Sequence, residues 1–219
     1  MTVAAVILAA RPESALGDAD GLPGVRRIAE VAWSGGAIPV VIVSFDPEGR
    51  VAAALVGTEA ELIAPAPVDG GPVGQICYGI DGAIGLVGDT DGALIWPAGM
   101  VWPDPETITS LIEAHGADAG TILRPQFDDE PGWPVLLPLA GLGHLRGLPA
   151  GRLPDELIQD LAAGGFAVRA LDLGDPGTVN DASVARSDLP PYRGPGEPAS
   201  GHVHEWGETE ADDLDLLPG

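Results

Sequence analysis

The sequence contains no lysine and a single cysteine. All ten basic residues are arginine, against 33 aspartates and glutamates, which gives a formal net charge of −23. So few cationic groups cannot neutralise the phosphates of nucleic acid or an anionic membrane surface, and we expect neither as a partner. The lone cysteine, Cys77, excludes an internal disulfide framework and a cysteine-based zinc cluster.

Long hydrophobic runs are also missing. The longest apolar stretches fall short of the roughly 20 residues that a membrane-spanning helix needs. Residues 3–10 are apolar but lack the preceding basic residues of a secretory signal. We therefore expect a cytoplasmic protein. A chain of 219 residues suits one α/β domain with a tail.

Candidate strands and helices alternate along the chain. Short apolar runs predict strands at residues 3–9, 38–43, 60–64, 93–96, 120–123 and 167–171. Amphipathic segments predict helices at residues 25–33, 48–56, 73–87, 106–115 and 154–163. Prolines flank residues 133–138, which favours an edge strand, and residues 141–146 are too rich in glycine to predict a helix. The alternation predicts a mostly parallel sheet with helices on both faces.

From Ser187 the chain becomes rich in proline, glycine and acid. Such a segment buries too little apolar surface to offset its ordering entropy, so we predict a domain at 1–186 and a disordered acidic tail at 187–219. The tail nevertheless contains large apolar residues among its acids: Trp206, Leu214, Leu216 and Leu217. It is therefore either a solubility tail or a segment that docks on a protein partner.

The first 23 residues carry a family resemblance. An apolar strand runs into Leu8-Ala9-Ala10, followed by Gly17 and then by Leu22-Pro23. This order resembles the opening of the molybdenum cofactor guanylyl- and cytidylyltransferases, a MobA-like group of NTP transferases. Further segments resemble the group in the same order, at residues 26–44, 69–79, 92–106, 131–135 and 177–181. The resemblance implies a three-layer α/β sandwich with a mostly parallel Rossmann-like sheet, of the nucleotidyltransferase (GT-A-like) type.

The resemblance also implies the positions of the site. Its nucleotide-binding residues would be Leu8, Ala9, Ala10, Arg11, Gly17, Gly71 and Gly74. In the family, loop amides, an arginine, a lysine and a Mg²⁺ ion held by aspartates bind the phosphates. Here Ala15 stands at the arginine, Asp20 at the lysine and Gly99 at the metal-binding aspartate, so no catalytic residue is predicted with these roles.

The lost charges have a large expected effect. Two unit charges about 4 Å apart interact by roughly 4 kcal/mol at an effective dielectric constant near 20. Even with half of this screened, the replacements at Ala15 and Asp20 remove several kcal/mol of triphosphate affinity, or a factor of about a thousand. Gly99 offers the metal no carboxylate, although Asp89, Asp91 and Asp104 lie close enough in sequence to be considered as substitutes.

Arg11 is either a relocated phosphate ligand or a residue that blocks the pocket and pairs with Glu13. Trp96 and Trp102 flank the end of a predicted strand and either stack on a ligand ring or pack over a loop. The position of Trp133 between two prolines favours a packing role for its side chain.

Other candidate groups give weaker signals. His115 and His144 have no partner at metal-binding spacing and are assigned to the surface or to loops. Cys77 is assigned as a buried structural thiol. His202, His204 and Glu205 alternate in the tail without a rigid frame, so we predict no metal site there.

Three functions remain open from the sequence. The first is a catalytically degraded relative that serves as a binding or assembly subunit, without a cofactor. The second is an active enzyme that moves NMP from an NTP onto a phosphorylated cofactor precursor such as molybdopterin, with Mg²⁺. The third is a binder of another small molecule, with Trp96 and Trp102 as stacking surfaces.

Overall fold

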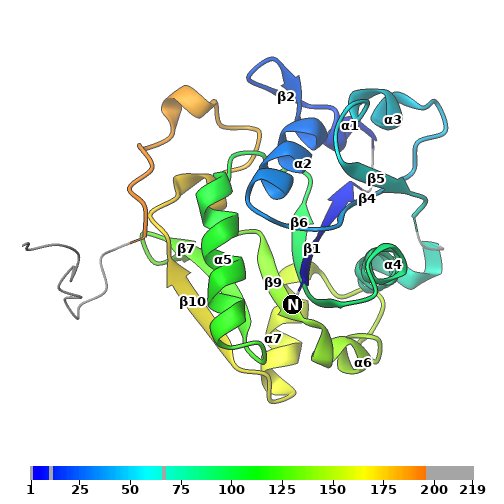
Figure 1. Ribbon diagram of the computed structural model, residues 1–219, viewed down its shortest axis with the longest axis vertical. Helices are drawn as coiled ribbons and strands as arrows, with labels where there is room; N and C mark the ends of the chain where they lie inside the picture. Colours follow the sequence, from blue (N-terminus) through cyan, green and yellow to red (C-terminus); the bar gives the residue numbers. More distant parts are fainter. Residues whose placement is uncertain (1, 10–11, 66–67, 196–219) are drawn as a thin grey trace, which may run out of the picture.

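The computed structural model describes residues 2–9, 12–65 and 68–195 (Figure 1). An eight-stranded sheet has the order β10-β7-β9-β6-β1-β4-β5, with β8 paired to β7. Its strands are β1 (Thr2–Ala9), β4 (Val40–Ser44), β5 (Ala60–Ile63), β6 (Thr90–Pro97), β7 (Ile122–Phe127), β8 (Glu130–Pro131), β9 (Val135–Pro138) and β10 (Val168–Asp172). A separate hairpin is formed by β2 (Asp18–Ala19) and β3 (Leu22–Pro23).

The central strands are parallel, so their carboxyl ends meet at one edge. β1 runs parallel to both β4 and β6, and β4 runs parallel to β5. In the register, Leu8 lies opposite Pro97 and Ala9 lies opposite Ser44. Residues from three distant parts of the sequence therefore share this edge.

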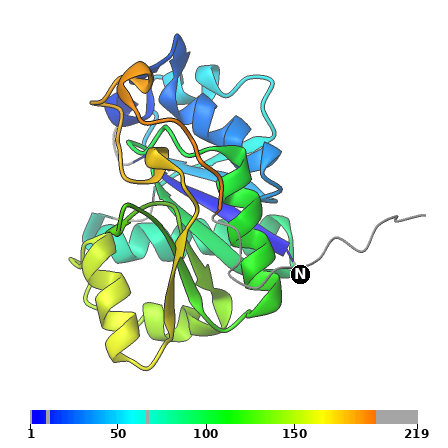
Figure 2. The ribbon, with the colours of Figure 1, turned by 90° about the vertical axis from the view of Figure 1, so that its left-hand side faces the viewer.

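Helices cover both faces of the sheet (Figures 1 and 2). One face carries α2 (Gly24–Ser34), α3 (Arg50–Ala54) and α5 (Pro105–Ala117), and the other carries α4 (Gly71–Leu86), α6 (Leu142–Leu145) and α7 (Pro154–Ala163). Each helix layer packs on alternate residues of the buried strands, which gives two apolar clusters separated by the sheet. A single helical turn, α1 (Pro12–Ala15), follows β1.

The helix start signals in the sequence have visible causes in the structure. At α5, the Asp104 side chain accepts a hydrogen bond from the backbone N–H of Glu106 at 3.4 Å, and Pro105 occupies the first turn. Both features favour a helix N-terminus.

The predicted three-layer α/β sandwich with a mostly parallel sheet is confirmed. One strand assignment was wrong. β9 is not an edge strand, because it pairs with both β6 and β7. Pro134 lies just before β9 and Pro138 at its last position, so the prolines remove ladder donors only at the ends. Residues 142–145, where no helix was predicted, form the short helix α6.

Part of the predicted tail packs against the domain. The backbone N–H of Arg193 donates to the carbonyl of Gly174 at 2.9 Å, and the Arg193 guanidinium lies 5.2 Å from the centre of the Phe127 ring. Residues just beyond the predicted boundary at 186 therefore contact the domain, and the extent of the disordered tail stays a prediction. Residues 196–219, with the four large apolar residues and the two histidines of the tail, lie outside the described residues. In the part of the chain that the structure describes, no helix has the length and apolar character needed to cross a bilayer.

Candidate functional site

An open crevice of about 400 Å³ lies where the carboxyl ends of β1, β4 and β6 meet the start of α4. Open α/β sheets bind ligands at this position. The crevice is lined by Leu8, Ala9, Val43, Gly71, Pro72, Gln75, Pro97 and Pro154. None of these side chains carries a charge, so the described lining offers a polyphosphate no cation.

The amino end of α4 is partly closed to anions. The backbone N–H of Val73 donates to the carbonyl of Ala150 at 3.4 Å, and Pro72 has no N–H. Gly71 has φ +56°, and a Cβ there would lie 2.3 Å from the same carbonyl oxygen. Free amides are what make a helix N-terminus attractive to phosphate. Because a carbonyl oxygen already lies against this one, its affinity for an anion is reduced.

Only part of the predicted nucleotide-binding set comes together. Leu8, Ala9 and Gly71 line the crevice, whereas Gly74 does not. Gly17 lies at the base of the β2–β3 hairpin, where its carbonyl accepts a hydrogen bond from the Gly24 N–H at 2.8 Å. Ala10 and Arg11 lie outside the described residues, so both roles considered for Arg11 stay predictions.

The two positions that the resemblance aligns with the family's arginine and lysine differ in their surroundings. Asp20 is exposed in the turn of the β2–β3 hairpin, where Asp20 and Gly21 both have positive φ, as tight hairpin turns require. Ala15 is completely buried. An arginine at residue 15 would have to enter the core, whereas a lysine at residue 20 would remain in solvent.

The surroundings of Gly99 do not fit the magnesium ion that the resemblance implies. A Cβ at Gly99 would meet no atom within 4 Å, so the position has room for a carboxylate but supplies none. The backbone N–H of Ala182, in the neighbouring C-terminal segment, donates a hydrogen bond to the Gly99 carbonyl at 2.9 Å. The Asp181 carboxylate there is engaged by the Ser183 N–H and hydroxyl, which hold its pKa below the ordinary value. Among the described residues, no three His, Cys, Asp or Glu side chains gather as a metal site.

The substitute acids are also badly placed. Asp91 accepts a hydrogen bond from the Thr2 N–H at 3.2 Å, at the amino end of the sheet. Six residues of strand, or roughly 20 Å, separate Asp91 from Pro97 at the crevice. Asp89 precedes β6 at that same end, and Asp104 caps α5.

Neither predicted stacking tryptophan is available to a ligand in the crevice. Trp96 is fully buried, and its indole N–H donates to the Met100 carbonyl at 2.7 Å. Trp102 is 3% exposed, and its indole N–H donates to the carbonyls of Asp181 and Val184. Both side chains are therefore packed, as the second of the two roles considered for them requires. Trp133 is also packed, with the Arg124 guanidinium 5.4 Å from its ring centre.

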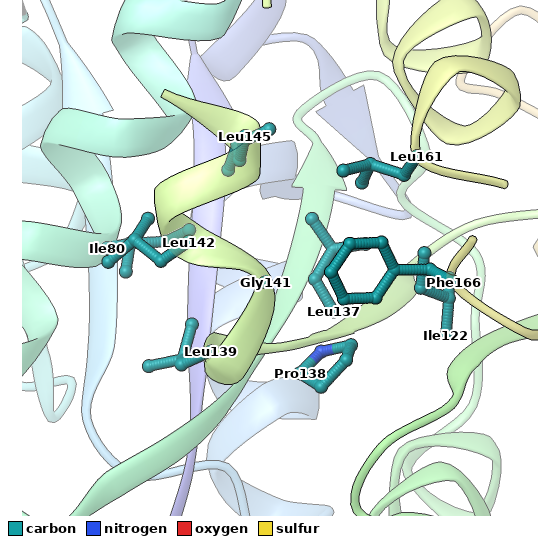
Figure 3. Close-up of a pocket in the computed structure, with 10 residues that line it drawn as sticks. All are labelled: Ile80, Ile122, Leu137, Pro138, Leu139, Gly141, Leu142, Leu145, Leu161 and Phe166. Carbon is teal, nitrogen blue, oxygen red and sulfur yellow. The ribbon is translucent and has the colours of Figure 1, made fainter. Parts of the chain in front are cut away.

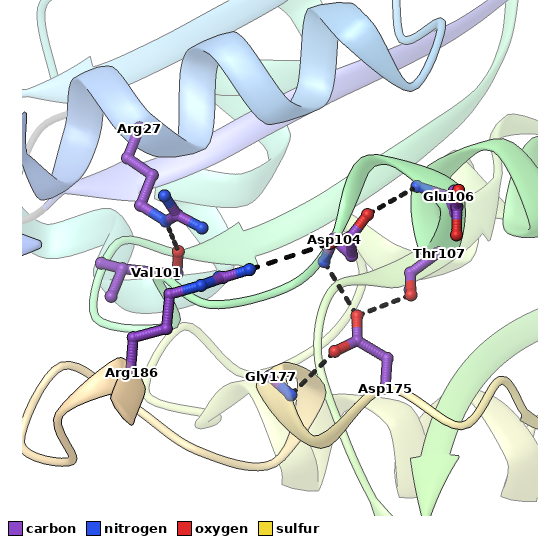
Figure 4. A network of polar contacts seen from close by, with 8 residues as sticks. All are labelled: Arg27, Val101, Asp104, Glu106, Thr107, Asp175, Gly177 and Arg186. Carbon is purple, nitrogen blue, oxygen red and sulfur yellow. Dashed lines mark hydrogen bonds and ion pairs between the residues drawn. The ribbon is translucent and has the colours of Figure 1, made fainter. Parts of the chain in front are cut away.

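A buried carboxylate that the sequence did not reveal joins the β6–α5 loop to the C-terminal segment (Figure 4). Asp175 is 3% exposed, and its Oδ2 accepts hydrogen bonds from the Asp104 N–H at 2.8 Å and the Thr107 hydroxyl at 2.6 Å. Its Oδ1 accepts from the Gly177 N–H at 2.8 Å. Desolvation raises the pKa of Asp175, against the opposing effect of these hydrogen bonds. We call these four residues the Asp175 network.

Arginines flank this network. The Arg27 Nε–H donates to the Val101 carbonyl at 2.9 Å, and a guanidinium nitrogen of Arg186 lies 3.9 Å from Asp104 (Figure 4). Asp104 and Thr107 are about 70 residues from Asp175 in sequence, so no local pattern announces the pairing. The Asp-Pro-Gly turn at 175–177 was the available signal, since aspartate commonly bonds an amide two residues on.

Two other assignments can be compared with the structure. His115 was assigned to the surface, but it is fully buried, because Gly92 leaves room for its ring at the amino end of β6. His144 is exposed, as predicted. Cys77 is half-buried within α4, and burial raises the pKa of its thiol, which disfavours the reactive thiolate.

One further hollow lies between the sheet, α6 and Phe166 (Figure 3). Its volume of about 10 Å³ has space for about one water molecule. The side chains around it, such as Ile80, Leu137 and Phe166, are apolar. It is a packing gap and holds no group that could recognise a ligand.

Comparisons with solved structures agree with this fold. A nucleotidyl transferase from Methanothermobacter is 16% identical, with a TM-score of 0.63, covering 78% of this chain and 87% of that one. The manganese complex of Rv0371c from Mycobacterium tuberculosis is 17% identical, with a TM-score of 0.62 and coverages of 78% and 88%. A 4-diphosphocytidyl-2C-methyl-D-erythritol synthase from Anaerococcus prevotii is 11% identical, with a TM-score of 0.63 and coverages of 83% and 92%.

At these identities the similarity establishes the fold alone. A comparison with curated proteins gave no match. A comparison with protein families matched residues 13–163, more than half of the chain, to the MobA-like NTP transferase domain. Together with the nucleotidyltransferase fold, this match identifies the chain as a member of the MobA-like NTP transferase family.

Proposed function

We propose that this chain is a catalytically degraded member of its family that acts as a binding or assembly subunit. The observation that carries the proposal is the uncharged lining of the crevice. Phosphoryl and nucleotidyl transfer depend almost entirely on positioned charge, supplied by cationic side chains and metal ions. There is open space at Gly99 in place of a metal-binding carboxylate. The described residues of the site therefore supply neither a cationic side chain nor a carboxylate that could hold a metal ion.

A thermal shift panel on the full chain tests the proposal. Millimolar Mg-GTP, Mg-CTP and Mg-ATP should leave the melting temperature unchanged, because a ligand stabilises a protein only in proportion to its binding. A metal-dependent shift, together with pyrophosphate release in the presence of a phosphorylated acceptor such as molybdopterin, would instead support an active nucleotidyltransferase.

A gain-of-charge variant tests the electrostatic reason. Asp20→Lys with Gly99→Asp should raise Mg-nucleotide affinity by about tenfold or more, since one attraction between unit charges is worth a few kcal/mol. Ala15→Arg is not included, because residue 15 is buried. The matched control is Glu113→Lys with Gly99→Asp, which makes the same charge change at an exposed residue of α5. Equal affinity of the two variants would contradict the charge argument.

We further propose that a protein partner binds through residues 187–219. Since Leu189 and Arg193 contact the domain, the docking residues would be those of 196–219, where Trp206 and the leucines stand among acids. Acidic segments with a few large apolar side chains commonly fold on a partner. The full chain with Trp206, Leu214, Leu216 and Leu217 changed to alanine should lose the partner at an unchanged melting temperature. Retention of the partner would contradict the assignment.

A further inference from the structure

Two arginines that face the loop after β6 lie together without a close acid partner. Arg27 makes no ion pair with a described residue, and Arg186 reaches only Asp104, at 3.9 Å. The other arginine ion pairs among the described residues are 3.4 Å or shorter, and they are made by Arg26, Arg124, Arg146, Arg152 and Arg193. The chain has 33 acids to ten arginines, so a shortage of carboxylates does not explain the difference.

The two guanidinium groups are close enough to repel each other. Arg27 projects from α2 and Arg186 from the short C-terminal helix η4 (Arg186–Asp188), and both reach toward residues 101–104 (Figure 4). Burial and the positive charge of Arg186 lower the pKa of Arg27. Arginine nevertheless stays protonated at neutral pH, so the pair carries two positive charges. Like charges held together are unfavourable, and a bound anion would remove the repulsion.

Trp102 connects the two arginines. The Arg27 guanidinium lies 5.2 Å from the centre of the Trp102 ring, and its Nε–H is bonded to a backbone carbonyl of the same loop. The indole N–H of Trp102 donates to the carbonyls of Asp181 and Val184, in the segment that leads to Arg186. One buried ring therefore positions Arg27 and anchors the segment that carries Arg186. Groups that are held in place beforehand lose less entropy when a ligand binds.

The ends of both side chains are open to solvent. The terminal nitrogens of Arg27 make no hydrogen bond to a described residue, and no nitrogen of either arginine is both buried and without a partner. The Arg186 side chain is 41% exposed. The pair therefore presents unused N–H donors to solvent, in the planar fork geometry that suits oxyanions.

Three acids weaken the positive field at this place. Asp20, Asp104 and Glu30 act on the pKa of Arg27 in the direction opposite to that of Arg186. Glu30 is paired with Arg26 at 2.8 Å, and Asp104 also accepts a hydrogen bond from the first turn of α5. We therefore expect an anion to bind weakly, and more tightly once the charge of Asp104 is removed.

From this geometry we propose that Arg27 and Arg186 together bind a phosphate monoester. One guanidinium fork fills both oxygens of a carboxylate, whereas the three terminal oxygens of a phosphate reach two forks. A phosphate monoester carries a charge of about −1.5 to −2 at pH 7, which matches two guanidinium groups. The ester belongs either to a small phosphorylated molecule or to a phosphorylated side chain of a partner protein. Neither arginine lines the crevice, so the site does not depend on the proposed function.

NMR titrations of the isotope-labelled full chain, without metal, test the proposal. Methyl phosphate is the probe, trimethyl phosphate is its uncharged counterpart, acetate fills a single fork, and acetyl-Ala-phosphoserine-Ala-amide presents the ester on a peptide. Methyl phosphate should shift the Trp102 indole and Arg27 Nε–H signals. It should bind about tenfold more tightly than trimethyl phosphate and about fivefold more tightly than acetate, with weaker binding at high salt. Peptide binding of equal strength assigns the ester to a partner's side chain, and binding of methyl phosphate alone assigns it to a small molecule.

Variants locate the site and supply the control. Arg27→Gln and Arg186→Gln should each weaken methyl phosphate binding by about tenfold, because each removes charged hydrogen bonds. Asp104→Asn keeps an acceptor that caps α5 but removes a repelling charge, and should strengthen binding by about threefold. Arg50→Gln removes an exposed arginine that also makes no ion pair with a described residue, and should bind as the wild type does.

Equal affinity for methyl phosphate and trimethyl phosphate, or unchanged binding by Arg186→Gln, would overturn the proposal. Arg186 is exposed, so its replacement is not expected to unfold the domain. Failure of the proposed function would look different. Mg-nucleotide would then shift the amide signals of crevice residues such as Leu8 and Gly71, and neither Arg27→Gln nor Arg186→Gln would abolish that response.

Discussion

Two sites lie near the loop that follows β6, and they are opposite in character. The crevice, whose lining includes Pro97 at the end of β6, has only uncharged residues among those described. The Ala150 carbonyl lies against the N-terminus of α4, the helix that borders it. The Asp175 network, which includes Asp104 at the far end of the same loop, holds a buried carboxylate with three hydrogen-bond donors. Among the described residues, charge is present where it fixes the backbone and absent from the crevice, where a polyphosphate would need it. The comparison indicates that the fold does not require the groups that bind nucleotide.

Replacing the central carboxylate of the Asp175 network should have the largest effect on stability. Asp175→Ala leaves three donors unpaired in a buried place, which should lower the free energy of unfolding by about 3 kcal/mol. For a domain of this size, that corresponds to a fall in melting temperature of about 6–12 °C. Denaturant unfolding measures the change. Asp155→Ala, in an exposed ion pair with Arg124, is the control and should cost at most about 1 kcal/mol. Equal losses in the two variants would mean that the network does not hold the loop.

Two glycines near the same loop should respond differently to an added methyl group. At Gly177 a Cβ would lie 2.1 Å from the Trp102 carbonyl oxygen, so Gly177→Ala should cost about 2.5 kcal/mol through overpacking. At Gly99 no atom lies within 4 Å, so Gly99→Ala should stay within about 0.5 kcal/mol of the wild type. A large loss at Gly99 would show that this position is more constrained than the structure indicates.

Two glycines of α4, one lining the crevice and one beside it in sequence, should also respond differently to an added methyl group. Gly71→Ala places a side chain at positive φ and against the Ala150 carbonyl, and should cost about 2 kcal/mol. Gly74→Ala meets open space within the same helix and should be neutral or should stabilise by up to about 1 kcal/mol, since alanine favours helices. Thermal unfolding of both variants measures the difference. A neutral Gly71→Ala would show that residue 150 can move away from the helix.

The smallest effect is the pH dependence that Asp175 contributes. Its pKa in the folded chain is raised by desolvation above the ordinary value of 3.8. An acid with a raised folded pKa contributes stability that is present below the unfolded pKa and is lost as pH rises through the folded pKa. The stability of the wild type relative to Asp175→Asn should therefore decline upward from about pH 4 and then level off. A constant difference across this range would contradict a buried, desolvated carboxylate.

The sequence predicted the elements well because their signals are local. The buried runs at β1 and β4 and the amphipathic pattern of α2 each specify their own conformation within a few residues. β9 was wrongly predicted to be an edge strand because prolines flank it, and the sequence does not show which strands pair with it. In a strand of four residues, terminal prolines cost few ladder bonds, and pairing on both sides outweighs them.

The site was predicted only in part, for a geometric reason. Leu8, Ala9 and Gly71 belong to recognisable segments and were found. Val43 and Pro97 were missed, although both end strands at the same edge. Stacking in the crevice was one of two roles considered for Trp96, but its side chain points to the α2 and α5 face, whereas Leu8 and Val43 face α4. Successive strand residues point to opposite faces, so a shift of one position decides which side chain meets a ligand.

The sequence by itself determined the fold family and the order of the elements, because these depend on residue identity and local periodicity. Only the tertiary structure decided which side chains share the crevice and that Asp175 joins segments far apart in sequence. Those facts follow from strand register and the facing of the pleat, which bring distant residues together in ways that no local pattern specifies.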